Sequence, residues 1–164
     1  MNIRLIEVQD AENFLFLSQV IEESGMMLFE PGEKQLSVDE QKASIERILA
    51  VPNSALFVAE KGGDLAGYIA AFGGKVKRTS HSAYLVLGVH PDYYRQGIAS
   101  KLFEKLFQWA LQRGIKRLEL TVIKYNEKAF SLYEKMGFSI EGEKVHSLYI
   151  DGEPVNEYYM YKLI

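Results

Sequence analysis

Apolar and polar positions divide the chain into strand-like and helix-like segments, with no internal repeat or low-complexity tract between them. Apolar residues that run together or alternate with polar ones predict strands over residues 3–5, 55–60, 65–72, 82–89, 118–122, 139–148 and 155–162. Apolar residues at helical spacing predict helices over residues 10–23, 37–51, 97–113 and 126–136.

The resulting order is β-α-α-β-β-β-α-β-α-β-β, which indicates an α/β fold of the α+β type with a mixed sheet. We expect an antiparallel meander first, then a strand–helix–strand crossover, then a final hairpin. The length of 164 residues suits one domain, so residues 1–164 are interpreted as a single domain.

Residues with a strong local preference mark several of the element ends. Asp10 is expected to cap the first helix, and residues 37–40 form a capping box for the second. Turns are expected at residues 61–64 and 151–152, where glycine follows a polar residue. Gly137 is expected to end the last helix in a Schellman motif.

Composition narrows the possible chemistry. The 19 Lys and Arg residues against 22 Asp and Glu give a net charge of −3, with no basic excess to follow a nucleic-acid backbone. The absence of cysteine excludes disulfides, thiolate metal sites and a cysteine nucleophile, and the 3 His residues show no zinc-site spacing. The first residues lack signal-peptide features, and no 18-residue apolar run is present. We therefore expect a cytoplasmic protein without metal, membrane or nucleic-acid partners.

The first candidate site is the junction between a strand and a helix at residues 87–99. The first turn of a helix presents unpaired N–H groups and a partial positive charge, which suits an anion. Gly97 and Ala99 leave room for a phosphate, and Arg95 adds a cation. Neither a Walker A loop nor a dinucleotide fingerprint is present. The alternative is a plain strand-to-helix connection.

The second candidate site is the helix that begins at Asn126. Asn126 and Tyr133 are seven residues apart, so they lie on one helix face about 10.5 Å apart. The Tyr133 phenol is a possible proton donor to a leaving group. The alternative is that Asn126 is only an N-cap and Tyr133 only a packing residue.

Taken together, these two stretches resemble the GNAT superfamily of N-acetyltransferases. That family has a strand ending in Val-x-Pro, then Arg/Gln-x-x-Gly-x-Gly/Ala, and later Asn-x-x-Ala-x-x-x-Tyr-x-x-x-Gly-Phe. Residues 89–91, 94–99 and 126–138 match these patterns, except that Tyr94 stands at the usual Arg/Gln position. Residues 138–152 resemble more specifically the branch of ribosomal-protein and spermidine acetyltransferases.

The resemblance implies an acetyltransferase fold with acetyl-CoA as cosubstrate. The pyrophosphate would then bind the amides of residues 95–100, with either Tyr94 or Arg95 assisting. The pantetheine arm would pair with the strand at Leu87 and Val89, and the Val89 amide would polarise the thioester carbonyl. Asn126 would bind pantetheine, and Tyr133 would assist the departing thiolate. The implied cofactor-binding residues are Leu87, Gly88, Val89, Arg95, Gln96, Gly97, Ile98, Ala99, Ser100 and Asn126.

The reaction implied is direct attack by a primary amine in a ternary complex. His81 is the first candidate for the base and is placed with Tyr133 as catalytic, because histidine is a common general base near neutral pH. His146, Glu22 and a water chain remain alternatives.

The acceptor is expected to be a small cationic amine, because the regions that usually contact it are rich in acids: Glu22, Glu23, Glu30, Glu33, Glu141, Glu143, Asp151, Glu153 and Glu157. A solvated acidic face explains the same acids. Two other functions stay open: acetylation of a protein N-terminus or ribosomal protein, and a non-catalytic acyl-CoA sensor. A homodimer is possible, as in many relatives.

Overall fold

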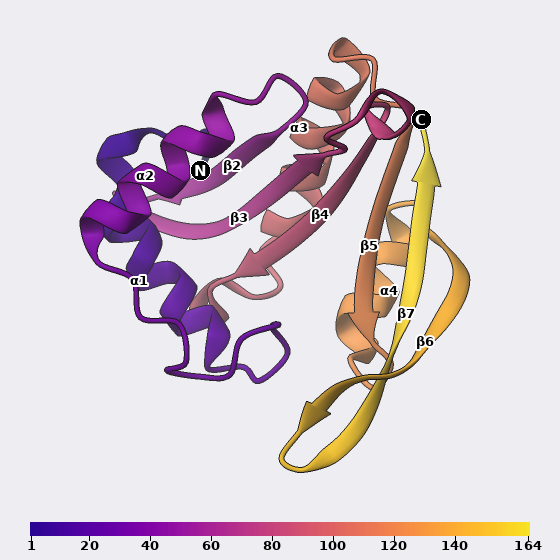
Figure 1. Ribbon diagram of the computed structural model, residues 1–164. Coiled ribbons are helices and arrows are strands. Elements are labelled where there is room, and N and C mark those ends of the chain that lie inside the picture. The colour runs from indigo at the N-terminus through magenta and orange to yellow at the C-terminus, as the bar shows by residue number, and fades with distance from the viewer.

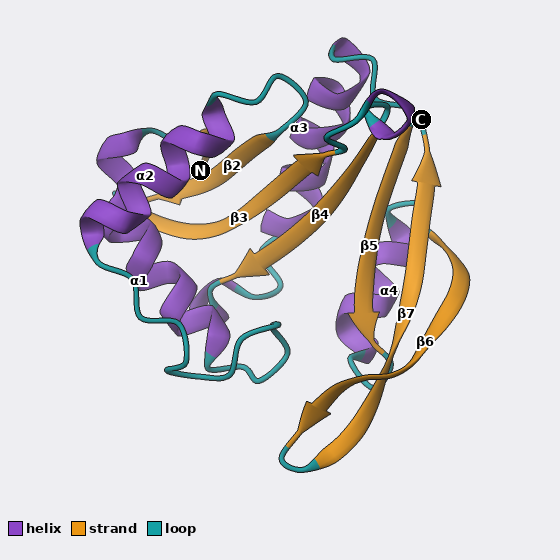
Figure 2. Cartoon of the chain, in the orientation of Figure 1, coloured by secondary structure: helices purple, strands orange, loops and turns teal.

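The computed structural model describes residues 1–164 and contains one seven-stranded sheet with helices on both faces (Figures 1 and 2). The strands are β1 (Asn2–Leu5), β2 (Ala55–Lys61), β3 (Asp64–Gly73), β4 (Ser82–Val89), β5 (Arg117–Ile123), β6 (Ser139–Ile150) and β7 (Glu153–Leu163). The helices are α1 (Ala11–Glu22), α2 (Val38–Leu49), α3 (Ile98–Gln112) and α4 (Glu127–Lys135). Short 3₁₀ turns lie at Val8–Asp10, Lys77–Thr79 and Pro91–Tyr93.

The strand order is β1-β2-β3-β4-β5-β7-β6, and all neighbours are antiparallel except β4 and β5. The predicted meander, crossover and final hairpin are therefore confirmed, as is the predicted order of helices and strands. The largest differences in bounds are two residues, at the end of α2 and in the final hairpin, where β6 and β7 extend nearly to the turn at Asp151 and Gly152.

Two apolar cores hold the helices on opposite faces of the sheet. On one face, Phe14, Leu17 and Ile21 of α1 pack with Ile45 of α2. On the other face, Leu102 and Leu106 of α3 are buried, and Phe103 packs with Tyr133 and Phe138. The sheet is therefore covered on both sides, and only a break within it can open a path between the two faces.

The expected helix cap at Asp10 differs in the structure. Asp10 precedes α1, but its side chain makes no capping hydrogen bond to that helix. Its carboxylate instead accepts hydrogen bonds from the Arg4 guanidinium at 2.8 Å and from the Glu7 amide at 2.8 Å. Arg4 also binds Glu60 on β2, so this ion-pair cluster ties the start of α1 to the edge of the sheet and lowers the pKa of Asp10. The Asp10 carboxylate therefore binds the charged Arg4 side chain instead of the amides of α1.

The pairing of the sheet is interrupted between β4 and β5, which opens a path between its two faces. Their parallel pairing covers only three residue pairs, from Ser82 with Arg117 to Tyr84 with Glu119. Beyond this point the two strands diverge, as Figure 1 shows. The Tyr84 hydroxyl and the Thr121 hydroxyl are 2.8 Å apart and bridge the strands where they separate. Each strand keeps its other neighbour, so the facing backbone edges beyond the bridge are left unpaired.

Candidate active site

A cleft of about 2130 Å³ occupies the space between the diverging strands. It is lined by β3, β4, residues 93–95 and 97–100, β5 and α4. Residues of α1, the loop after α1, α2 and the β6–β7 hairpin also line it. Its size exceeds that of an ordinary small-ligand pocket, which leaves room for two ligands at once.

The start of α3 has open space and uncapped amides at the residues predicted to bind an anion. Gly97 adopts a left-handed conformation with φ of 76°, and no atom lies within 4 Å of the position a Cβ would take. No side chain caps the first turn of α3, so its amides point toward the cleft without a side-chain partner. Arg95 also has a positive φ, and both Arg95 and Tyr94 line the cleft.

The free edge of β4 presents backbone donors to the cleft. The His90 amide donates to the Ala66 carbonyl on β3 at 2.9 Å. Successive amides of a strand alternate between its two edges, so the amides of Val89 and Leu87 point the other way, toward β5. Because β5 has diverged at this level, these two amides are open to a ligand.

Gly88 permits a close approach on the opposite side of the sheet. A Cβ at this position would lie 2.8 Å from Tyr68 Cε1 and 2.9 Å from Ile21 Cδ1. Tyr68 on β3 and the C-terminal turn of α1 therefore pack directly on the β4 backbone at residues 87–89. The predicted ligand-binding stretch of β4 is thus adjacent to the end of α1.

Tyr133 reaches the cleft from the α3 side of the sheet. Its ring packs edge-on against Phe103, with centroids 6.0 Å apart, and the residue is only 8% exposed. Burial raises the pKa of Tyr133, and the nearby Tyr84 adds to the rise, so the phenol keeps its proton at neutral pH. Asn126 caps α4 by accepting from the Ala129 amide at 3.4 Å, which leaves its NH₂ group free to donate.

Three polar or charged residues are buried in the chain, and all three line this cleft. They are Glu22, Gln41 and Glu157, which are 7%, 4% and 9% exposed. Glu157 accepts a hydrogen bond from Ser147 at 2.8 Å. The cations that reach the same side of the cleft, Lys34, Arg47 and Lys144, are all exposed. Buried charges are screened less than exposed ones, so Glu22 and Glu157 contribute more to the electrostatic potential inside the cleft than these exposed cations do.

The structure brings most of the predicted site residues together. Those that line the one cleft are Leu87, Gly88, Val89, Arg95, Gly97, Ile98, Ala99, Ser100, Asn126 and Tyr133. Gln96 is not among them, because its side-chain amide binds Lys61 and the Asp92 carbonyl instead. Of the nine acids expected near the acceptor, only Glu22 and Glu157 line the cleft.

His81 lies elsewhere. It is exposed at the start of β4, beside a separate small cavity that also contains Arg117 and Glu119. Its position outside the cleft gives no support to the catalytic role expected from the sequence. His146 is exposed on the β6 side of the final hairpin and does not line the cleft either.

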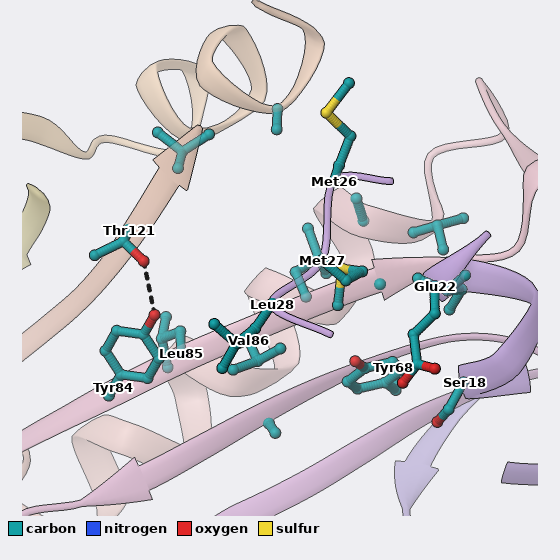
Figure 3. Close-up of a pocket in the computed structure, with 18 of the residues that line it drawn as sticks. Ser18, Glu22, Met26, Met27, Leu28, Tyr68, Tyr84, Leu85, Val86 and Thr121 are labelled. Atoms are coloured by element: carbon teal, nitrogen blue, oxygen red, sulfur yellow. Dashed lines mark hydrogen bonds between the residues drawn. The ribbon is translucent and has the colours of Figure 1, made fainter. Parts of the chain in front are cut away.

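Tyr68 and Gln41 are among the cleft residues that sequence reasoning missed, because nothing in the local sequence around either one points to a ligand. Tyr68 is brought to the cleft by its register opposite Gly88. Figure 3 shows the Glu22 carboxylate beside the Tyr68 ring, while Tyr84 and Thr121 form the other end of the view. Burial raises the pKa of Tyr68, and the charges of Glu22 and Tyr133 add to this rise.

The chain belongs to the GNAT acetyltransferase family, whose model matches residues 19–138. It is similar to the spermidine N(1)-acetyltransferase of Escherichia coli K12, with 31% identity over 98 residues. That match covers 59% of this chain and 52% of the relative, so the chain spans about half the length of that protein.

Solved structures share the whole fold. A GNAT-family acetyltransferase from Streptococcus pneumoniae has a TM-score of 0.94 and 31% identity, covering 99% of both chains. The acetyltransferase yncA from Salmonella typhimurium, solved with its cofactor acetyl-CoA, has a TM-score of 0.88 at 16% identity, covering 99% of this chain and 93% of its own.

None of the four helices α1 to α4 of the present chain is both long and apolar enough to span a bilayer.

The contact at Gly88 yields a first prediction. Gly88→Ala should lower the free energy of unfolding by about 1–3 kcal/mol, because its Cβ overlaps Tyr68 and Ile21 and forces both to shift. Gly142→Ala is the matched control, because a Cβ there meets only Tyr159 at an ordinary 3.6 Å. Urea unfolding of the two variants measures the difference. Equal stability of the two variants would show that α1 does not pack tightly on β4.

Proposed function

We propose that the protein is an N-acetyltransferase that moves the acetyl group of acetyl-CoA to a primary amine by direct attack in a ternary complex. The observation that carries this proposal is the break between β4 and β5. It joins an anion-binding helix start, a free strand edge and a buried phenol in one cleft. The family assignment and the acetyl-CoA bound in the similar Salmonella protein support the choice of cosubstrate.

Acetyl-CoA would bind along the α3 side of the cleft. Its pyrophosphate would accept hydrogen bonds from the amides of residues 95–100, where the helix dipole adds a favourable field. Its pantetheine arm would extend the β1–β4 half of the sheet, pairing with the free amides of Leu87 and Val89. The NH₂ group of Asn126 would bind the same arm from the start of α4.

The chemical step would use one donor on each side of the thioester. The Val89 amide would bind the carbonyl oxygen and stabilise the negative charge that develops when the amine adds. Tyr133 would donate a hydrogen bond to sulfur as the C–S bond breaks. A thiol has an ordinary pKa of about 8.5, below that of a buried phenol, so Tyr133 is suited to share its proton rather than lose it.

The acceptor would be a small cationic amine that enters between α1 and the final hairpin. Two buried carboxylates, Glu22 and Glu157, face that part of the cleft and would attract an ammonium group. The similarity to spermidine N(1)-acetyltransferase supports the same class. A protein N-terminus or ribosomal protein as acceptor, and a sensor without turnover, are the rival functions that the experiments below separate.

Gly97→Glu should abolish acetyl-CoA binding, because the new side chain places volume and negative charge where the pyrophosphate would lie. Gly114→Glu at the other end of α3 is the matched control, since Gly114 has a similar φ of 72° and equally open space. Both variants carry the same backbone strain, so only the ligand distinguishes them. Isothermal titration calorimetry measures the affinity. Unchanged affinity of a folded Gly97→Glu variant would refute the proposed pyrophosphate site.

Tyr133→Phe should reduce kcat by about 10²- to 10⁴-fold while leaving acetyl-CoA affinity unchanged. The substitution removes only the hydroxyl and keeps the ring against Phe103. Steady-state release of CoA thiol measures turnover, and a thermal melt checks folding. Turnover equal to that of the unmodified protein would mean that Tyr133 is a packing residue. Absence of turnover in the unmodified protein itself would favour the sensor.

An acceptor screen should show turnover with small amines that carry a positive charge, and little with neutral or acidic amines. Polyamines, aminoglycosides, amino acids and N-terminal peptides, each at the same concentration, cover the competing classes. The two buried carboxylates of the cleft, Glu22 and Glu157, give the reason for the preference. Turnover confined to peptides would promote the protein-modifying alternative.

A further inference from the structure

Glu22 is the most unusual charged group of the molecule. It ends α1, is 7% exposed and lines the cleft, yet its carboxylate has no hydrogen bond or salt bridge. By contrast, Glu157, the other buried acid, is bound by Ser147. No side-chain oxygen of the protein is both fully buried and unpaired, so the Glu22 carboxylate still reaches solvent, although most of the residue is buried. Partial desolvation of a carboxylate is costly, and a cation bound beside it would offset that cost. The remaining exposed part of Glu22 faces the cleft, which is where a compensating cation would come from.

The position of Glu22 relative to β4 is fixed by its neighbours. Ile21 and Tyr68 both lie against Gly88, in the space that a side chain at that position would fill. Glu22 follows Ile21 directly and lies beside Tyr68 in Figure 3. The carboxylate is therefore held close to the stretch of β4 whose amides would bind the thioester. Tyr133 belongs to the core on the other face of the sheet, so the acid and the phenol approach this stretch from opposite sides.

We propose that Glu22 is the catalytic base that takes a proton from the ammonium group of the acceptor. This inference rests on the proposed acetyltransferase function. The ammonium would bind beside Glu22 and lose one proton to its carboxylate. The free amine would then attack the thioester carbonyl carbon. The C–N bond forms, the C–S bond breaks, and the second proton of the nitrogen passes to the sulfur, which Tyr133 hydrogen-bonds. The products are an amide and CoA thiol, and the proton on Glu22 returns to water through the cleft.

The surroundings suit this role. Desolvation raises the pKa of Glu22, the nearby Glu33 adds to the rise, and Lys34 opposes it. Tyr68 faces the carboxylate from β3 and stays protonated, and Arg47 of α2 lines the same cleft. A carboxylate with a raised pKa is a stronger base than an ordinary one, which suits it to accept a proton from an ammonium group.

The test compares Glu22→Gln with Glu23→Gln, its exposed neighbour at the end of the same helix. Rates are measured from pH 5.5 to 9 with the best amine of the acceptor screen. Glu22→Gln should lower kcat/KM by about 10²- to 10⁴-fold at pH 7 and remove the acidic limb of the pH profile, with unchanged acetyl-CoA affinity. Glu23→Gln should behave as the unmodified protein does.

A second readout needs no activity. The folded pKa of Glu22 is raised, so the folded state binds more protons than the unfolded state just above the unfolded pKa of about 4.3. The unmodified protein should therefore lose stability relative to Glu22→Gln as pH rises from 4 to 7. Its Tm should fall below that of the variant at pH 7 and equal it at pH 4.

The outcomes separate the base from the overall function. If the unmodified protein turns over amines and Glu22→Gln keeps both its rate and its acidic limb, Glu22 is not the base. A changed KM with unchanged kcat and pH profile would also overturn the proposal, since it would make Glu22 a binding residue only. If the unmodified protein binds acetyl-CoA but acetylates no amine in the screen, the proposed function itself fails and the base assignment fails with it.

Discussion

The structure depends on how few residues join β4 to β5. Three parallel pairs, the hydrogen bonds from the Lys116 and Arg117 amides to the His81 carbonyl, and one hydroxyl bridge join the two strands directly. Each strand is paired along nearly all of its length on its other side. The two strands are therefore fixed in position but not hydrogen-bonded to each other along most of their length. Backbone N–H and C=O groups must find partners when they are buried, and an unpaired strand edge inside a covered sheet leaves that requirement to water or a ligand. The binding site follows from this constraint before any side chain is considered.

The polar side chains of the cleft enter it from opposite faces of the sheet. Tyr133 rises from the aromatic cluster around Phe103, and Glu22 and Tyr68 come from the core that α1 shares with β3. A thioester held on β4 would meet a hydrogen-bond donor from one face and an acid from the other. The apolar packing that buries these groups is also what raises their pKa values, so the stability of the cores and the chemistry of the cleft have a common origin.

The parts of the site that sequence reasoning found are those held together by local structure. Gly97 and Ala99 lie within one helix start, and Asn126 and Tyr133 lie on one helix, so spacing alone was enough to place each pair. The choice of His81 illustrates the opposite case. It precedes a strand that leads to Val89, and eight residues of strand span about 26 Å, so its sequence proximity to the phosphate loop did not bring it close.

Tyr68 was not predicted and Glu22 was only one of several alternatives for the base, for a related reason. They are brought to the cleft by the packing of α1 and by the register of β3 against β4, both of which are long-range. The one local sign was Gly88, a glycine inside a strand, which marks a close approach without saying what approaches. The expected cap of α1 also failed because of a residue outside the helix. The Asp10 carboxylate binds Arg4 on β1, although the local sequence pattern predicted that it would cap the helix.

The divergence of β4 and β5 also bears on self-association. An unpaired strand edge on the outside of a sheet invites another chain to add to it. Here the outer edge strand β6 has two register irregularities against β7, a left-handed residue at His146 and charged residues at Glu143 and Lys144. These features disfavour the addition of a further strand. Two further unpaired edges, those of β4 and β5, lie in the middle of the sheet and face each other across the cleft. The unpaired backbone groups of β4 and β5 are therefore accessible to a narrow, extended ligand but not to a strand of another protein molecule.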